Sequence, residues 1–190
     1  MKEFLIRPIK KEDNPDIASI VRSILKEFGA NKPGTVYFDP TTDDLFSLFQ
    51  TPNSFYFIAG MEGKMIGGSG VFPTPGLPDG YCELVKLYLV PDARGKGIGH
   101  RLMEACFDKG REFGFKKIYL ETMPELRNAL GLYEKAGFTY LPGPLGKSGH
   151  FGCDLWMIKE LVPQTGGFDT DRKIQPAAEK KPGQNRSTPS

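Results

Sequence analysis

Hydrophobic and polar positions along the chain follow two different periods, and each period predicts a different kind of element. Apolar residues recur at helical spacing through Ile17, Val21 and Ile24, after the helix-start signal at residues 13–15 and before Gly29. Similar spacing predicts further helices at Asp43–Phe49, from Ile98 to Phe113, and at Glu125–Ala136.

Shorter apolar or alternating runs predict the strands of a sheet. They lie at Phe4–Ile9, Ser54–Ala59, Lys64–Val71, Tyr81–Val90, Lys117–Glu121, Phe138–Leu141 and Phe151–Ile158. Three Gly- or Pro-containing segments read as loops, at Asn31–Pro40, Phe72–Gly80 and Pro142–Gly152. The predicted order, βα(α)βββαβαββ, is typical of an α/β (α+β) protein with a single domain.

The composition changes near the end of the chain. From Pro163 onward Pro, Gly, Gln, Lys and Ser dominate, and apolar residues are few. Such a segment buries too little apolar surface to offset the entropy lost on ordering. We therefore predict a folded domain over residues 1–161 and a flexible polar tail over residues 162–190.

Overall composition and charge narrow the class of protein. Hydrophobic residues make up 39%, charged residues 25%, and the formal net charge is only +2, so no nucleic-acid or membrane partner is expected. No apolar run reaches the roughly 18 residues that span a bilayer, and Arg7 and Pro8 interrupt any signal-peptide core, so we expect a cytoplasmic protein. Cys82, Cys106 and Cys153 lack paired spacing, which predicts buried thiols rather than a disulfide framework or a metal site.

The strongest chemical signal is the segment Arg94-Gly-Lys-Gly-Ile-Gly99, which lies between a strand and a helix. The first amides of a helix lack partners and carry partial positive charge, and glycines let an anion approach the backbone closely. Arg94 and Lys96 add cationic charge. The pattern predicts a phosphate site, although an ordinary Gly-rich turn remains the plain alternative.

Two other glycine motifs fail on spacing. A dinucleotide fingerprint that starts at Gly95 requires a third glycine at position 100, which is His100. A P-loop that ends in Gly146-Lys147-Ser148 requires a glycine at position 141, which is Leu141, and strand-like sequence follows it. Neither motif is predicted.

Together, two motifs resemble the GNAT superfamily of N-acetyltransferases. The segment at residues 94–99 is similar to its acetyl-CoA signature, and Leu132-Tyr-Glu-Lys-Ala-Gly-Phe138 is similar to its second hallmark, about 40 residues further on. The resemblance implies a mixed, mostly antiparallel sheet of about seven strands, flanked by helices. It also implies a splay between strands four and five, Tyr81–Val90 and Lys117–Glu121, into which the pantetheine arm of acetyl-CoA would enter like an added strand.

The resemblance also implies which residues hold the cofactor. Strand positions Leu87, Tyr88 and Leu89 would contact the pantetheine arm through their backbone. Around the pyrophosphate it places Arg94, Gly95, Lys96, Gly97, Ile98, Gly99 and His100. The chain departs from the family where many members carry an asparagine seven residues before the hallmark tyrosine, because Leu126 stands there and Asn128 is out of register.

Acetyl transfer to an amine requires a base, a donor to the thioester oxygen and an acid for the leaving thiolate. By family position the base is Glu83, eleven residues before Arg94, and partial burial is expected to raise its pKa. The same resemblance implies that Tyr133 is the acid and that the Leu87 N–H is the carbonyl donor. The structural alternatives are a solvent-facing or lysine-paired glutamate and a core tyrosine.

The acceptor side is less defined by the sequence. His150 precedes the last strand and is a candidate substrate contact, and Cys153 beside it offers a weaker nucleophile hypothesis. We predict transfer from acetyl-CoA to a small-molecule amine by direct attack in a ternary complex, with no metal. A protein or peptide acetyltransferase and a non-catalytic acyl-CoA sensor remain alternatives, and the family resemblance allows a homodimer.

Overall fold

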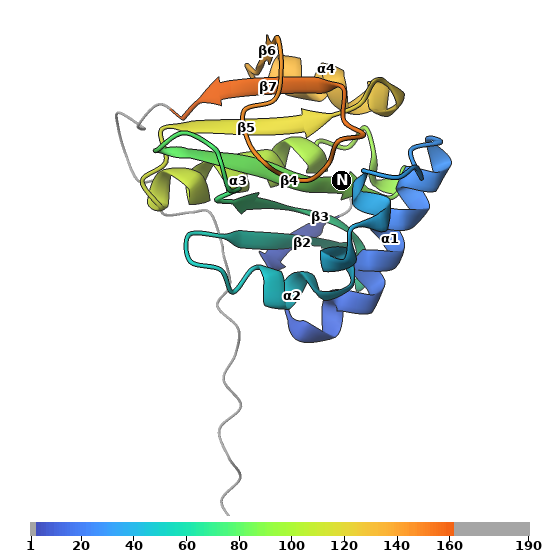
Figure 1. The fold of residues 1–190 in the computed structure, drawn as a ribbon. Helices are drawn as coiled ribbons and strands as arrows, with labels where there is room; N and C mark the ends of the chain where they lie inside the picture. Colours follow the sequence, from blue (N-terminus) through green and yellow to red (C-terminus); the bar gives the residue numbers. More distant parts are fainter. Residues whose placement is uncertain (1–2, 162–190) are drawn as a thin grey trace, which may run out of the picture.

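The computed structural model describes residues 3–161 and shows a sheet flanked on both faces by helices (Figure 1). The predicted tail at residues 162–190 lies outside the described residues. Seven strands pair in the order β1-β2-β3-β4-β5-β7-β6. Their bounds are β1 Phe4–Pro8, β2 Phe55–Met61, β3 Lys64–Phe72, β4 Tyr81–Leu89, β5 Lys117–Thr122, β6 Thr139–Leu141 and β7 Leu155–Glu160.

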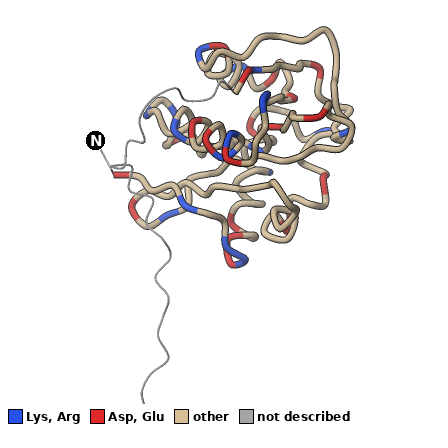
Figure 2. The backbone as a smooth tube through the Cα atoms, turned by 90° about the vertical axis from the view of Figure 1, so that its left-hand side faces the viewer, with Lys and Arg blue, Asp and Glu red and all other residues tan. Residues whose placement is uncertain are grey.

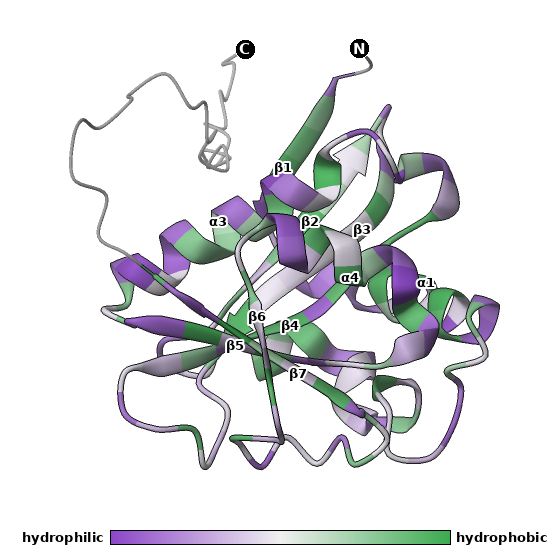
Figure 3. Ribbon diagram, turned by 90° about the horizontal axis from the view of Figure 1, so that it is seen from above, coloured by the Kyte–Doolittle hydropathy of each residue, from purple (hydrophilic) through white to green (hydrophobic). Residues whose placement is uncertain are grey.

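Amphipathic helices cover the two faces and divide the core in two. The helices are α1 Asn14–Glu27, α2 Leu45–Leu48, α3 Ile98–Glu112 and α4 Arg127–Lys135. One core cluster joins the sheet to α3 and α4, and the other joins it to α1 and α2. Figure 3 shows α1 and α3 on opposite sides of the sheet, with hydrophobic residues concentrated where they meet it.

The predicted element order is confirmed, with corrections to the bounds of the last strand and the last helix. The strand expected at Phe151–Ile158 is wrong at both ends, because residues 151–154 form a loop and pairing with β5 continues to Glu160. Phe151 in that loop is 81% exposed. The helix expected at Glu125–Ala136 begins at Arg127, because Pro124–Leu126 forms a separate 3-10 turn.

The splay predicted between strands four and five is present. β4 and β5 are parallel and pair over only three positions, from Tyr81 opposite Lys117 to Glu83 opposite Tyr119. Beyond Glu83 the two strands separate, while β5 continues its antiparallel pairing with β7 as far as Thr122. The separation leaves the second half of β4 with a free edge that faces a gap in the sheet.

A β-bulge in β4 lies directly beside this gap. Gly70 pairs with Val85 and Gly68 pairs with Tyr88, so Lys86 and Leu87 oppose the single residue Ser69. Lys86 adopts φ +50°, a left-handed conformation that is unfavourable for a lysine. The buried hydroxyl of Tyr56 donates to the Lys86 carbonyl oxygen at 2.9 Å and satisfies the acceptor that the bulge displaces.

The bulge changes which side of the sheet each β4 side chain faces. Before it, Leu84 faces the α3 core and Val85 faces the α1 core, as alternation requires. Lys86 would then face α3, but it contacts Asp39 and Thr42 on the α1 side. After it, Leu87 faces the α3 core and Tyr88 faces the α1 core. The bulge thus places a lysine on the same face as Glu83.

Glycines on β3 make room for the rings that support the bulge. A Cβ at Gly68 would lie 2.5 Å from the Phe57 carbonyl oxygen and 2.6 Å from the Tyr56 ring. A Cβ at Gly70 would lie 2.7 Å from the Tyr56 ring and 2.8 Å from Phe49. Side chains at these positions would displace Tyr56 from the carbonyl group that it binds.

Charged side chains are distributed over the outside of the domain. Lys and Arg alternate with Asp and Glu along the backbone in Figure 2, in keeping with the small net charge of +2. None of the helices within residues 3–161 combines the length and apolar character that crossing a bilayer requires.

We expect Gly68→Ala to lower the free energy of unfolding by about 1–3 kcal/mol, the usual cost of overpacking a filled core. The matched control is Gly131→Ala in α4, where an added Cβ meets no atom within 4 Å and alanine favours the helix. Urea denaturation of both variants measures the difference. Equal unfolding midpoints would show that β3 has room for a side chain.

Candidate active site

A cavity of about 550 Å³ occupies the gap between β4 and β5. It is lined at one end by the phosphate-type loop, along its length by β4, and on the other side by α4. The predicted site residues that line it are Glu83, Leu87, Tyr88, Leu89, Arg94, Gly95, Gly97, Gly99, His100, Tyr133 and His150. Lys96 and Ile98 are not among its lining residues, and the Ile98 side chain is buried in the core.

The loop before α3 has the geometry of an anion site. Gly97 caps α3 with φ +78°, and Gly95 has φ +73°, conformations that glycine adopts without strain. The first intrahelical bond is donated by the Arg101 N–H to the Gly97 carbonyl oxygen, so the amides of residues 98–100 precede the ladder. A Cβ at Gly95 or Gly97 would meet no atom within 4 Å, so the space above these amides is open to a phosphate.

The Arg94 side chain binds groups of the protein itself. The Arg94 guanidinium donates to both carboxylate oxygens of Glu27, at 2.7 and 2.8 Å, and its carbon lies 5.1 Å from the Phe28 ring centroid. Its Nε donates to the Leu89 carbonyl oxygen at 2.9 Å. Arg94 therefore fixes the end of α1 to the loop, in addition to lining the cavity.

Glu83 is the buried carboxyl group at the point where the strands separate. Only 4% of the residue is exposed, and the Thr74 hydroxyl donates to its carboxylate. Burial raises the pKa of Glu83 to about 7, with the Thr74 hydrogen bond opposing the rise. The negative charge of Glu121 raises this pKa further, and the charges of His150 and Lys86 reduce it.

Tyr133 projects from α4 into the same cavity. The residue is 7% exposed and packs edge-on against Phe138, with ring centroids 5.9 Å apart. Burial raises the pKa of its phenol above the usual value, so the hydroxyl stays protonated near neutral pH. The cavity thus joins a proton acceptor that titrates near pH 7 to a hydroxyl that can donate.

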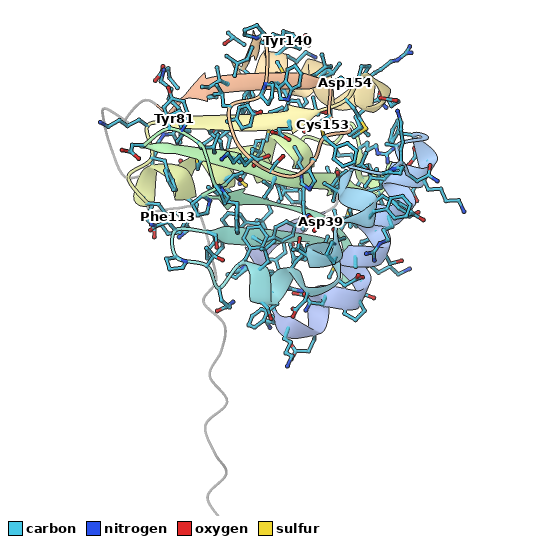
Figure 4. All side chains as sticks on the ribbon, in the orientation of Figure 1. Asp39, Tyr81, Phe113, Tyr140, Cys153 and Asp154 are labelled. Atoms are coloured by element: carbon cyan, nitrogen blue, oxygen red, sulfur yellow. The ribbon has the colours of Figure 1, made fainter. Side chains whose placement is uncertain are left out.

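A second group of charged residues lies beside Glu83, and of its three members only His150 was predicted from the sequence as a site residue. The Lys86 ammonium donates to Asp39 at 2.8 Å, and the His150 Nε2 lies 3.3 Å from the same carboxylate oxygen. Burial alone would raise the pKa of Asp39, but these two neighbours hold it well below its usual range. Figure 4 shows Asp39 on the α1 side of the sheet. The sequence signal for Lys86 is its position inside the apolar run of residues 84–90. Asp39 lies on a loop and gives no comparable signal.

β5 adds two further polar groups to the cavity wall. Glu121 accepts hydrogen bonds from the Tyr119 hydroxyl at 2.9 Å and the Ser148 hydroxyl at 2.6 Å. Thr122 Oγ1 is the one fully buried side-chain N or O atom in residues 3–161 without a hydrogen-bond partner. An unpartnered hydroxyl at the edge of the gap marks a position where a ligand would complete the hydrogen bonding.

Loops distant in sequence meet over the acceptor end of the cavity. The segment at residues 142–154 passes in front of β4 and β5 (Figure 1). Its Gly152 N–H donates to the Gly34 carbonyl oxygen and its Lys147 N–H to the Pro75 carbonyl oxygen, each at 2.8 Å. The segment at residues 142–154 therefore contacts both of the other predicted loops, at residues 31–40 and 72–80.

Comparison with known proteins settles the family. The sequence profile of the Acetyltransferase (GNAT) family matches residues 19–138. The chain belongs to this family. It is 38% identical over 159 residues to the uncharacterized N-acetyltransferase YjgM of Escherichia coli K12, covering 83% of this chain and 95% of that protein.

Solved structures share the fold. A GNAT acetyltransferase from Staphylococcus aureus Mu50 aligns with a TM-score of 0.75 at 16% identity, over 84% of this chain and 100% of that one. The PaiA N-acetyltransferase of Thermoplasma acidophilum, solved with coenzyme A, aligns with a TM-score of 0.64 at 20% identity, over 83% and 99%. The predicted fold is confirmed, and the protein is an acetyl-CoA-dependent N-acetyltransferase, a transferase of the acyltransferase class.

The cysteines of this GNAT protein are free and buried, as the sequence predicted. Cys153 lies near His150, whose carbonyl oxygen accepts the Cys153 N–H at 3.0 Å. Burial raises the pKa of the Cys153 thiol to about 12, so almost no thiolate is present at neutral pH. The environment does not activate this thiol as a nucleophile.

We expect the burial of Glu83 to make stability depend on pH. The folded pKa of Glu83, about 7, exceeds its unfolded value. Its contribution to the free energy of unfolding is therefore fully present below about pH 4.5 and is lost as pH rises toward 7. Glu83→Gln carries no titrating group at this position. The free energy of unfolding of the wild type should therefore fall relative to that of the variant between about pH 4.5 and 7, and the difference should stay constant above pH 7. Urea denaturation across that range measures it, and a difference that is constant throughout would exclude a raised pKa.

Proposed function

We propose that this enzyme transfers the acetyl group of acetyl-CoA to the amino group of a small molecule by direct attack in a ternary complex. The observation that carries the proposal is that one cavity connects the anion-binding start of α3 with the buried carboxyl group of Glu83. The two ends of that cavity suit the two substrates.

The residues at the α3 end suit coenzyme A. The amides of residues 98–100 and the open space above Gly95 and Gly97 would accept the pyrophosphate. The unpaired edge of β4 at Leu87 and Leu89 would hydrogen-bond the pantetheine arm, as a strand partner does. Leu126 and Asn128, where the family motif departs, both line the cavity and would contact the cofactor from α4 and the turn before it.

Bound acetyl-CoA supplies a thioester, and the chain supplies groups to move protons and stabilise charge. Glu83 would accept a proton from the acceptor ammonium, because its pKa near 7 leaves a large ionised fraction at neutral pH. The amine nitrogen then attacks the carbonyl carbon, and the Leu87 N–H at the bulge would donate to the oxygen as it gains charge. Tyr133 would give its proton to the departing sulfur as the C–S bond breaks, and the second proton, which the nitrogen loses as the amide forms, would restore the phenol.

The enclosed acceptor end supports a small substrate. Loops at residues 31–40, 72–80 and 142–154 meet there through backbone hydrogen bonds. An extended peptide would have to pass between these loops, which the backbone hydrogen bonds hold together. The protein-acceptor alternative therefore becomes an outcome of the experiment below.

The test is release of free thiol from acetyl-CoA in the presence of a panel of small amines, with a lysine-containing peptide as comparison. We expect small amines to be acetylated, and Glu83→Gln to lower kcat/KM by about 10²–10⁴, the range for loss of a general base. The wild-type rate should rise with pH through about 7, and the variant should lack that step. Calorimetry should show nearly unchanged coenzyme A affinity.

The control for that substitution is Glu12→Gln, which changes an exposed glutamate before α1. Exclusive acetylation of the peptide would reverse the choice of acceptor. Full activity of Glu83→Gln would remove Glu83 from the mechanism.

Tyr133→Phe provides an independent test of the acid. We expect kcat to fall by about 10²-fold with little change in KM for acetyl-CoA, because proton delivery to sulfur is lost while packing is retained. Tyr140→Phe is the matched control, since that tyrosine is 49% exposed on β6 and donates to Glu134 at 2.7 Å. Steady-state kinetics distinguish them, and equal rates for the two variants would argue against the role.

A further inference from the structure

We propose that the acceptor amine also carries a carboxylate, with its amino group beside Glu83 and Glu121 and its carboxylate beside Lys86 and His150. This inference rests on the proposed function and names the substrate class of the same site. All four side chains line the one cavity.

The bulge in β4 supplies the cationic part of this arrangement. It moves Lys86 onto the face that carries Glu83, three residues earlier, which is a span of roughly 10 Å along an extended strand. The side chain of Lys86 is only 4% exposed, and its position is maintained although φ is +50°. Solvation at the surface does not explain why a lysine is buried in a strained conformation beside a cavity.

The Lys86 ammonium retains a hydrogen-bond donor for a ligand. It donates to Asp39 at 2.8 Å and lies 3.4 Å from the Thr42 hydroxyl oxygen. The Thr42 hydroxyl itself donates to the Val36 carbonyl oxygen, so toward Lys86 it acts as an acceptor. An ammonium has three N–H donors, and within residues 3–161 these two partners leave one for an anion in the cavity.

Asp39 holds His150 on the same wall. Its Oδ2 lies within hydrogen-bond distance of both Lys86 and His150, and its Oδ1 accepts from the N–H and hydroxyl of Thr41. With every oxygen of Asp39 engaged, this carboxylate orients the two basic groups rather than binding an amine. A substrate carboxylate beside Lys86 and His150 would accept the remaining N–H of the Lys86 ammonium.

The other pair of side chains is acidic. Glu83 and Glu121 lie on β4 and β5 where the strands separate, and the negative charge of Glu121 adds to burial in raising the pKa of Glu83. Glu121 is held by hydroxyls of Tyr119 and Ser148, neither of which neutralises it. An ammonium between the two carboxyl groups would relieve their repulsion and would place its nitrogen next to the base.

The charges therefore divide into an acidic pair and a basic pair within one enclosed space. A simple alkylamine or a diamine would leave the third N–H of the Lys86 ammonium without an acceptor. An amino acid satisfies both pairs at once, and the loops at residues 31–40 and 142–154 limit its size. This complementarity favours a zwitterionic acceptor.

The experiment compares amino acids with their carboxamides as acceptors, over L-α-amino acids, β-alanine and γ-aminobutyrate, by thiol release from acetyl-CoA. Amidation removes the carboxylate and lowers the pKa of the amine, so chemistry alone would favour the amide. We expect the best acid to exceed its amide in kcat/KM by at least tenfold. In Lys86→Met the ratio of the acid rate to the amide rate should fall to about one, because the acid loses a partner that the amide does not use.

Lys86→Met leaves Asp39 buried without its cation, so a second variant protects the test from loss of folding. Lys86→Met/Asp39→Asn removes both charges, and His150→Gln removes the other basic group. Each should reduce the acid preference at least tenfold with coenzyme A affinity intact by calorimetry. Lys116→Met, which changes an exposed lysine before β5, is the matched control and should preserve the preference.

Two outcomes separate this inference from the proposed function. If carboxamides, alkylamines or diamines are acetylated as well as or better than the acids, the zwitterionic acceptor is excluded while the small-molecule acetyltransferase stands. If coenzyme A binds but no amine of either kind releases thiol, the proposed function fails, and the acceptor assignment fails with it.

Discussion

The incomplete pairing of β4 with β5 is the constraint on which the site depends. Parallel pairing ends after Glu83, and beyond that point the backbone groups of β4 have no neighbouring strand on that side. Unpaired backbone groups inside a protein are costly unless something satisfies them, so the gap suits a ligand that hydrogen-bonds like a strand. The same separation brings the phosphate-type loop, Glu83 and Tyr133 to one cavity. A sheet that closed fully would have no such site.

The bulge in β4 adds a second departure from regular structure, and neighbouring residues stabilise it. The Tyr56 hydroxyl binds the displaced Lys86 carbonyl oxygen, and Gly68 and Gly70 leave space for the Tyr56 ring. Ion pairing with Asp39 holds the lysine side chain against the strain of its positive φ. Three segments of sequence thus cooperate to direct one side chain toward the cavity. Irregularities of this kind often mark functional sites, where strain is retained because the surrounding structure over-determines it.

Much of the architecture could be predicted from the chain, because periodicity and turn residues act locally. The order of elements follows from hydrophobic periodicity. The splay and the placement of Glu83 and Tyr133 in one cavity were implied by the resemblance of two glycine-containing motifs to the GNAT superfamily. The start of β7 was misjudged because Phe151 is apolar yet lies on an exposed loop. Lys86, Asp39 and Glu121 were missed because long-range ion pairs and hydrogen bonds leave no local periodicity. Lys86 and Asp39 lie 47 residues apart in sequence, and Glu121 lies 27 residues from Ser148.

The bidentate contact between Arg94 and Glu27 has a mechanical consequence. It fastens the end of α1 to the loop that precedes α3, while Ile24 and Phe28 near that end of α1 line the cavity. At its other end α1 holds α2, since the Asn14 side chain accepts the Phe46 N–H at 2.9 Å. α1 is therefore anchored at both of its ends. Any tilt of α1 would move the loop at residues 94–97 and the cavity wall at Ile24 and Phe28 together, so a substitution remote from the cavity would change its shape.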